Sequence, residues 1–282
     1  MRKLIVHQEM LDTLFAQKKV EIPDCYTEPE ENEYLILKTI NNSSAVVYYA
    51  SPYFRLYNDV KPMQGIKPKD INQKAFFHSL QNKSVLMSVA LGKAGTGKTL
   101  ISIAYALEQY FRNGKAIILI KPSAYVGGKS NVMGILPGDV NDKLSGIMAS
   151  YLVHVRALLG VKAESFIYEL IENNMLQYLP VELARGMSLE NATVIFDECQ
   201  NTDLHTMKTI VSRVASSSKL ICLGDLGQID VQLKKSETGL SIFLESNSFK
   251  ESPVTSQITL KTQYRSELAD LCENITEEYY GD

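Results

Sequence analysis

A run of eight residues constrains the fold of this chain more than any other feature. Residues 92–99 read Gly-Lys-Ala-Gly-Thr-Gly-Lys-Thr, so a glycine is followed, after four residues, by Gly-Lys-Thr. Glycines let the backbone turn tightly around an anion with several N–H groups pointing inward, and the second lysine adds a positive charge. The sequence therefore predicts a loop that binds the phosphates of a nucleotide.

The segments on both sides of this loop match what phosphate binding requires. Residues 85–91 form an apolar run that predicts a buried strand, and residues 100–112 are apolar at helical spacing. A helix that begins at the loop directs the positive end of its dipole at the phosphates, and the Thr99 hydroxyl is placed to ligate Mg²⁺. A glycine-rich turn that matches by chance is the alternative. The residues predicted to bind the nucleotide here are Gly92, Lys93, Ala94, Gly95, Thr96, Gly97, Lys98, Thr99 and Leu100.

Composition limits the class of protein. The chain has 282 residues, of which 45% are hydrophobic and 22% charged, enough for one large α/β domain and a small appendage. No apolar run approaches the ~20 residues of a membrane span, so we expect a cytoplasmic protein without a membrane partner. Four cysteines without a CxxC pair and four scattered histidines predict reduced thiols and no zinc site. Because the net charge is −3, a nucleic-acid partner would need a local basic patch.

The N-terminal part of the chain carries no nucleotide motif and predicts a small β-rich unit. Residues 33–40 and 45–49 are β-prone runs separated by four turn-forming residues, which predicts an antiparallel hairpin. A helix is expected over residues 8–17, and a third strand follows the hairpin. We therefore divide the chain into an antiparallel appendage with its linker at 1–66 and a main domain at 67–282.

The main domain is expected to alternate strands with helices. Asp70 is placed to cap a short helix that carries Gln73, whose amide can donate to and accept from an adenine edge. An exposed helix residue is the alternative for Gln73. The alternation predicts a mostly parallel sheet covered by helices on both faces, with ligands at the carboxyl ends of its strands. After the loop, strands are predicted at residues 115–120, 176–179, 192–196, 219–223 and 257–260, and helices at residues 139–159, 164–173 and 204–214.

Polar residues follow three of these predicted strands. Asp197 would hold the Mg²⁺ ion and Glu198 would orient or deprotonate an attacking water, with an ordinary helix cap as the alternative. Asp225 and Gln228 could sense the terminal phosphate, with a capped turn as the alternative. Arg265 could neutralise charge on the transferring phosphoryl group, or form a surface salt bridge.

Together these motifs resemble the PhoH family of P-loop ATPases over about residues 67–273, most of the chain. Several motifs in the same order make the resemblance specific. It implies ATP and Mg²⁺ as ligands and a RecA-like fold. The residues that carry it are 92–99, 136–139, 185–186, 194–202, 224–225 and 228–230.

PhoH proteins are in turn similar to the first motor domain of superfamily 1 helicases. Asp225 with Gln228 resembles the third motif of that group, and residues 260–266 resemble its Leu-x-x-x-Tyr-Arg-Ser motif, whose arginine, here Arg265, reaches the γ-phosphate. Gln73 matches the adenine-reading glutamine of the group. The predicted catalytic residues are Lys98, Glu198, Gln228 and Arg265.

Two departures from these relatives shape the expected activity. Some relatives carry an N-terminal nuclease domain, and the corresponding residues here are too few for one, so we predict no nuclease. A superfamily 1 helicase has two motor domains, whereas this chain has the motifs of one. Either neighbouring copies form a ring, for which the resemblance suggests a hexamer, or the protein hydrolyses ATP without translocating.

A nucleic-acid strand would cross loops that follow strands away from the nucleotide. Residues 121–129 combine two lysines, a tyrosine and two glycines, a combination suited to a single-stranded backbone and to base stacking. A mobile surface loop is the alternative. The residues predicted to contact nucleic acid are Lys121, Tyr125, Lys129, Arg185 and Thr202.

The sequence thus favours Mg²⁺-dependent ATP hydrolysis coupled to binding, translocation on or remodelling of single-stranded nucleic acid, RNA rather than DNA. A nucleotide-dependent switch or scaffold that acts on protein partners is the second hypothesis. A kinase ranks last, because Glu198 and Gln228 favour water as the phosphoryl acceptor.

Overall fold

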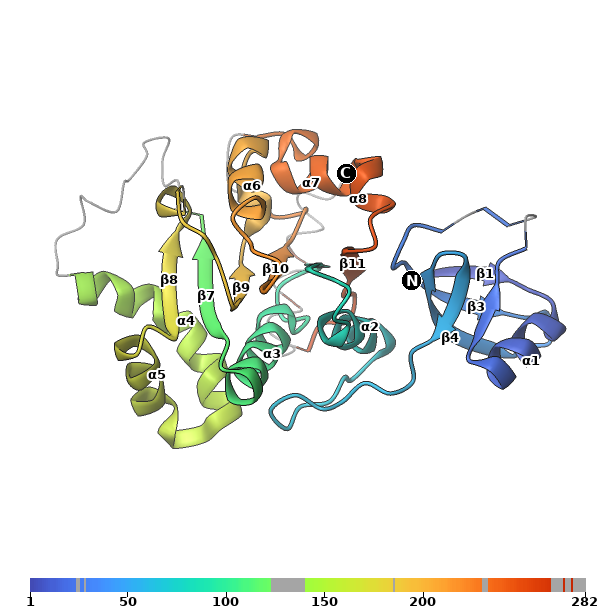
Figure 1. Cartoon of the computed structure of the whole chain (residues 1–282), viewed down its shortest axis with the longest axis horizontal. Coiled ribbons are helices and arrows are strands. Elements are labelled where there is room, and N and C mark those ends of the chain that lie inside the picture. Colours follow the sequence, from blue (N-terminus) through green and yellow to red (C-terminus); the bar gives the residue numbers. More distant parts are fainter. Residues whose placement is uncertain are drawn as a thin grey trace.

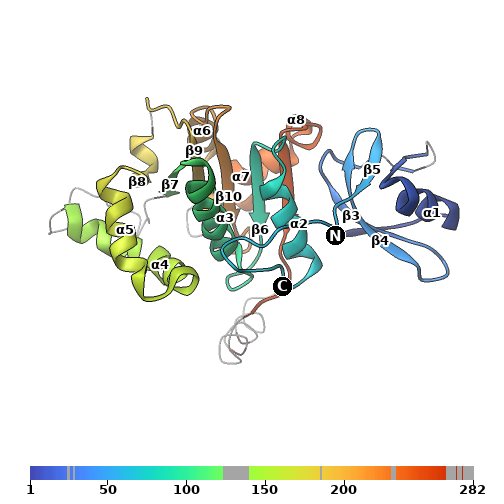
Figure 2. The same cartoon turned by 60° about the horizontal axis from the view of Figure 1, so that its bottom comes forward.

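Two β-sheets organise the chain in the computed structural model (Figure 1). The structure describes residues 1–23, 26–27, 29–122, 140–184, 186–229, 233–264, 271 and 275. A five-stranded sheet lies near the N-terminus, and a six-stranded sheet forms the main body. Figure 2 shows the smaller sheet beside the β11 edge of the larger one.

The six-stranded sheet is parallel throughout, with the strand order β11-β6-β10-β9-β7-β8. Its central strands are apolar on both faces and fully buried, which is the pattern of a parallel sheet covered on both sides. The predicted fold class is therefore confirmed. The strands are β6 (Met87–Leu91), β7 (Ala116–Lys121), β8 (Leu176–Pro180), β9 (Ala192–Phe196), β10 (Lys219–Gly224) and β11 (Thr255–Thr259).

Helices cover the two faces of this sheet in two groups (Figure 1). Successive side chains of β10 alternate between the two cores: Ile221 and Leu223 pack with one group, and Leu220 and Cys222 pack with the other. The first group contains α2 (Ile71–Gln81), α3 (Lys98–Asn113), α4 (Val140–Leu159) and α5 (Ala163–Glu172). The second contains α6 (Leu204–Val211), α7 (Gly239–Glu245) and α8 (Asn247–Lys250), of which the sequence analysis predicted only α6.

The strand register brings the expected functional loops to one edge of the sheet. Leu91 at the end of β6 lies opposite Gly224 of β10 and Thr259 of β11. Phe196 at the end of β9 lies opposite Cys222 of β10. The loops that follow β6, β9, β10 and β11 therefore begin side by side.

The N-terminal sheet corrects one prediction. The hairpin and the helix occur as predicted, but β1 pairs with β3 in parallel, so the sheet is mixed rather than antiparallel. β1 and β2 were not predicted because they are short, with four and three residues, and mostly exposed. Helix α1 covers this sheet with Leu11 and Leu14. The elements are β1 (Arg2–Ile5), α1 (Gln8–Gln17), β2 (Lys19–Glu21), β3 (Tyr34–Lys38), β4 (Ser44–Ala50) and β5 (Tyr53–Leu56).

A buried asparagine fastens the two sheets together. Asn32 has a left-handed φ of 57° and is 4% exposed, and its Nδ2 donates to the carbonyl oxygens of Pro253 (3.0 Å) and Thr255 (2.9 Å). The Tyr34 hydroxyl lies 2.8 Å from Nδ1 of His78, which is on α2. The N-terminal sheet is thus bonded both to the edge strand β11 and to helix α2, which precedes β6.

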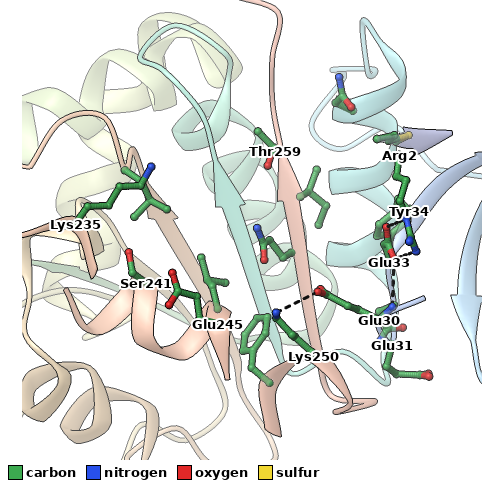
Figure 3. Close-up of a pocket in the computed structure, with 18 residues that line it drawn as sticks. Arg2, Glu30, Glu31, Glu33, Tyr34, Lys235, Ser241, Glu245, Lys250 and Thr259 are labelled. Atoms are coloured by element: carbon green, nitrogen blue, oxygen red, sulfur yellow. Dashed lines mark hydrogen bonds and ion pairs between the residues drawn. The ribbon is translucent and has the colours of Figure 1, made fainter. Parts of the chain in front are cut away.

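A cavity of about 430 Å³ lies where β11, α7 and the N-terminal sheet meet (Figure 3). Its wall carries two ion pairs, Lys250 with Glu30 (3.6 Å) and Arg2 with Glu33 (2.8 Å). Among the described residues, none of the phosphate-loop residues lines it. The candidate site therefore lies elsewhere, at the carboxyl ends of the strands.

Candidate nucleotide-binding site

The loop between β6 and α3 has the backbone that its glycines permit. Gly97 has a φ of 95°, in the left-handed region that favours glycine. Gly92 has a φ of 149°, and a Cβ there would lie 2.4 Å from the carbonyl oxygen of Leu260. A side chain at Gly92 would thus collide with the neighbouring backbone.

Lys98 places its charge inside this loop. It is the first residue of α3, and its Nζ donates to the carbonyl oxygens of Gly92 and Lys93, the latter at 2.9 Å. The buried Thr96 hydroxyl also donates to the carbonyl oxygen of Lys93 (2.9 Å). The ammonium group and the positive end of the α3 dipole therefore act on the same small volume.

Backbone hydrogen bonds fix the loop to both neighbouring strands. The Gly92 N–H donates to the carbonyl oxygen of Gly224 at the end of β10 (3.1 Å). On the other side, the Tyr264 N–H donates to the carbonyl oxygen of Gly95 (3.0 Å). The loop is therefore bonded to the last residue of β10 and to the segment after β11.

Asp197 and Glu198 stand at the end of β9, separated from β6 only by β10. The Asp197 N–H donates to the carbonyl oxygen of Ile120 (2.8 Å), which extends the sheet by one residue. Asp197 Oδ1 accepts from the Glu198 N–H (3.0 Å), and Oδ2 accepts from the hydroxyl of Tyr151 on α4 (3.3 Å). Burial raises the pKa of Asp197, the charge of Glu198 raises it further, and Lys121 opposes the rise. Because burial and the charge of Glu198 disfavour an isolated negative charge on Asp197, a cation bound to its carboxylate would stabilise the charged form.

Gln200 connects this acidic pair to the turn after β10. It is fully buried, its Nε2 donates to Glu198 Oε2 (2.7 Å) and to the carbonyl oxygen of Gln228 (3.0 Å), and its Oε1 accepts from the Asp225 N–H (3.2 Å). The sequence analysis assigned no role to Gln200 or to Tyr151. Only the position of Gln200 two residues after Glu198 offered a signal, and nothing in the sequence marked Tyr151.

The turn after β10 presents a carboxylate and an amide. Asp225 Oδ1 accepts from the Gly227 N–H (2.9 Å), while Oδ2 is buried without a hydrogen-bond partner in the described part of the chain. The Gln228 N–H donates to the carbonyl oxygen of Asp225 (3.0 Å), and Gln228 itself is exposed. A buried acceptor without a partner is uncommon, so Asp225 is ready to bind a polar ligand or a water molecule.

Gln73 and Tyr264 lie on the other side of the loop. Asp70 caps α2 through the N–H groups of Asn72 (2.7 Å) and Gln73 (2.8 Å), as predicted. Gln73 is 5% exposed, and its amide donates to the Thr96 carbonyl oxygen (3.0 Å) and accepts from the Lys69 N–H (2.9 Å). These bonds leave the amide one further donor and one further acceptor position.

Tyr264 is held beside the same helix start. Its hydroxyl donates to Asp70 Oδ2 (2.7 Å), and the Lys69 ammonium lies 4.6 Å from its ring centroid. A partly exposed aromatic ring is thus fixed next to Gln73 and the loop.

The remaining predicted residues divide into two groups. Lys121 ends β7 near Asp197, and Thr202 is 5% exposed, with its hydroxyl donating to the carbonyl oxygen of Cys199 (2.7 Å). The hydroxyl of Thr202 is therefore turned into the protein. Four predicted residues lie outside the described part of the chain: Tyr125, Lys129, Arg185 and Arg265.

Two features are absent from the described residues. No group of three or more His, Cys, Asp and Glu side chains among them could hold a metal ion by itself. No helix among them is long and apolar enough to cross a membrane.

Comparison with known proteins identifies relatives over most of the chain. The family model described as PhoH-like protein matches residues 65–279. Protein PhoH2 of Bacillus subtilis is 28% identical over 284 residues, covering 97% of this chain and 63% of the relative. Protein PhoH2 of Mycolicibacterium smegmatis is 26% identical over 280 residues, covering 99% and 62%. The chain thus spans about three fifths of the length of these relatives.

Among solved structures, the crystal structure of Pif1 helicase from Candida albicans is similar with a TM-score of 0.40 and 16% identity. The similarity covers 77% of this chain and 45% of that chain. The fold assignment rests on the strand order and the two helical layers described above.

Proposed function

This chain belongs to the PhoH-like protein family, and we propose that it hydrolyses ATP with Mg²⁺. The observation that carries the proposal is the meeting of opposite charges at nearby strand ends. Lys98 lies inside the loop after β6, and Asp197 and Glu198 follow β9, with only β10 between the two strands. A triphosphate bound by the loop would present its terminal phosphate to the carboxylates.

The residues of the site fit a magnesium ion. Thr99 and Asp197 offer a hydroxyl and a carboxylate, the oxygen donors that Mg²⁺ prefers. Few protein ligands suffice, because Mg²⁺ usually keeps several waters and binds phosphate oxygens, which agrees with the lack of a three-residue cluster among the described side chains. When bound, Mg²⁺ neutralises charge on the phosphates.

The other residues have distinct proposed roles. Lys98 would offset the negative charge of the phosphates, and a carboxylate oxygen of Glu198 would orient the attacking water and take its proton. Gln228, exposed on the turn after β10, would contact the terminal phosphate. Arg265 is proposed to neutralise charge that develops on the phosphoryl group. The buried acceptor of Asp225 supports a polar ligand at this turn.

Adenine is the proposed base. Gln73 has one donor and one acceptor position left for the base edge. Tyr264 lies beside it with a partly exposed ring, on which a base could stack. The two residues are far apart in the sequence, and both bond to Asp70 at the start of α2.

We propose further that hydrolysis is coupled to single-stranded nucleic acid, RNA rather than DNA, in a helicase-like ring of six copies. The family resemblance and the cationic, aromatic composition of residues 121–129 support this step. We leave Thr202 out of the proposed path because its hydroxyl is bonded inside the protein. A switch or scaffold that acts on protein partners remains the alternative.

ATPase measurements test the proposal. The purified chain should hydrolyse ATP only with Mg²⁺, Lys98→Ala should lose nucleotide binding, and Glu198→Gln should bind ATP but lose turnover. A Glu198→Gln variant that hydrolyses ATP like the parent would refute the assigned role of this carboxylate. Strong stimulation by single-stranded RNA supports the motor, and its absence across several polymers supports the switch.

Light scattering with and without nucleotide tests the ring. In a ring whose arginines act between copies, Arg265→Ala mixed with Lys98→Ala should recover hydrolysis, since each copy supplies what the other lacks. A monomer under every condition would remove the ring.

A further inference from the structure

The side chain of Gln200 makes three hydrogen bonds in the candidate site. It lies in a short 3₁₀ turn, Cys199–Asn201, and is 0% exposed. Both N–H groups of the amide are used, one on Glu198 Oε2 and one on the Gln228 carbonyl oxygen, and Oε1 accepts from the Asp225 N–H. One side chain thus bonds to Glu198 and to both ends of the turn after β10.

Glu198 itself has an unusual backbone. Its φ is 54°, in the left-handed region that few non-glycine residues adopt. Three interactions hold it there: its N–H donates to Asp197 Oδ1, its carbonyl oxygen accepts from the Asn201 N–H (3.0 Å), and its carboxylate accepts from Gln200. Of the three, only the bond to Gln200 acts on the carboxylate, so it is the one that can orient the reacting group.

Close packing leaves Gln200 little freedom to move. A Cβ added at Gly224 would lie 3.1 Å from Gln200 Oε1 and 2.8 Å from Leu240 Cδ2. A glycine at the end of β10 therefore lets the amide approach the Asp225 N–H. The orientation of the amide is set by the strand end and the turn, not by solvent.

We infer that Gln200 is a positioning residue that fixes the carboxylate of Glu198 and makes its orientation depend on the turn at residues 225–228. The inference rests on the proposed ATPase function and adds to it a path between two parts of the site. The amide occupies Oε2 of Glu198, which directs Oε1 toward the attacking water. A ligand that moves Gln228 or Asp225 moves the amide, and the amide moves the carboxylate.

Two variants of Gln200 test this role. Gln200→Met keeps the length of the side chain and removes all three bonds, and Gln200→Glu keeps an acceptor for the Asp225 N–H but cannot donate to Glu198. Each should lower kcat by about ten- to a hundredfold, the usual effect of losing a hydrogen bond to a charged group, with ATP affinity changed less than about twofold. Gln109→Met, on the outer part of α3, is the matched control and should leave both constants unchanged.

A double-substitution cycle separates positioning from general support of the structure. In a Glu198→Gln background, single-turnover hydrolysis should show no further loss when Gln200→Met is added, because Gln200 acts through the carboxylate. A merely structural role predicts that the two losses multiply. Thermal unfolding of every variant shows whether each is folded.

Several results would overturn the role inferred for Gln200. Parent-like kcat in both Gln200 variants, or losses that multiply with that of Glu198→Gln, would overturn the inference while leaving the ATPase proposal intact. Failure of both variants to fold would also overturn it, since Gln200 would then serve the core. A parent chain without any Mg²⁺-dependent hydrolysis would overturn the proposed function, and this inference with it.

Discussion

A buried lysine at the amino end of β10 provides a quantitative test of the structure. Lys219 is 5% exposed, and its Nζ donates to the carbonyl oxygens of Ser79 (2.7 Å) and Asn82 (3.0 Å) at the end of α2. The ring centroid of Tyr105 is 5.8 Å away. Burial, aided by the charge of Lys115, lowers the pKa of Lys219 to about 7 from 10.5.

This lowered pKa makes stability depend on pH in a definite direction. Between about pH 7 and 10.5 the unfolded chain binds a proton at Lys219 and the folded chain does not, so the free energy of unfolding rises with pH. The slope is about 1.4 kcal/mol per pH unit. Because half of the folded molecules are still protonated at pH 7, the contribution of Lys219 should rise by about 2.3 kcal/mol from pH 7 to 9, and it is lost again as pH falls through this window.

Lys219→Met removes the titration while keeping the length of the side chain. Urea unfolding of the parent and the variant at several pH values gives a difference in which all other titrating groups largely cancel. That difference should grow by about 2.3 kcal/mol from pH 7 to 9 in favour of the parent. Lys83→Met, an exposed lysine in the same region, controls for the loss of one charge. A parent-minus-variant difference that stays flat would show that the carbonyl oxygens and the ring keep Lys219 charged in the fold.

Three further substitutions test other parts of the structure. Gly92→Ala should weaken binding of a fluorescent ATP analogue and destabilise the fold by about 1–3 kcal/mol, because its Cβ would meet the Leu260 carbonyl oxygen at 2.4 Å; parent-like affinity would contradict the loop geometry. Tyr151→Phe should raise the Mg²⁺ concentration needed for half-maximal ATPase activity roughly tenfold, because Asp197 loses a hydrogen-bond donor; an unchanged Mg²⁺ titration would show that the hydroxyl is dispensable. Asn32→Ala should lower the free energy of unfolding by about 1–3 kcal/mol more than Asn42→Ala, since both positions have a left-handed φ but only Asn32 bonds the edge strand; equal losses would contradict that contact.

Local sequence patterns were enough to predict the parts of the fold that depend on residues close together in the sequence. The phosphate loop and its flanking strand and helix follow from glycine spacing and apolar periodicity, and Asp70 caps α2 as its position predicted. β1 and β2 were missed because three or four residues are too few for a period to show. The parallel pairing of β1 with β3 depends on a contact about 33 residues away in sequence, which no local pattern encodes.

The positions of candidate site residues could be predicted where the residues directly follow a strand. They could not be predicted where elements distant in the sequence meet. Asp197 and Glu198 follow their strand directly, so an apolar run marked their place. Tyr151 reaches Asp197 from a helix 46 residues earlier, and it reads in the sequence as an ordinary apolar position of that helix. Gln200 is close to Glu198 in sequence, but its other two partners follow the next strand, which only the strand register brings alongside.

The same register connects three segments of the candidate site to one another. Gly92 bonds to Gly224, and the chain from Gly224 runs directly into the turn that Gln200 links to Glu198. On the other side, Gly95 accepts from Tyr264, the residue before Arg265. We therefore expect a shift of the loop on binding phosphate to reach Glu198 through Gly224, the turn and the Gln200 side chain on one side, and the segment at Tyr264 on the other. The bonds from the loop to Gly224 and to Tyr264 are made by main-chain atoms, so they constrain the loop whatever side chains surround it.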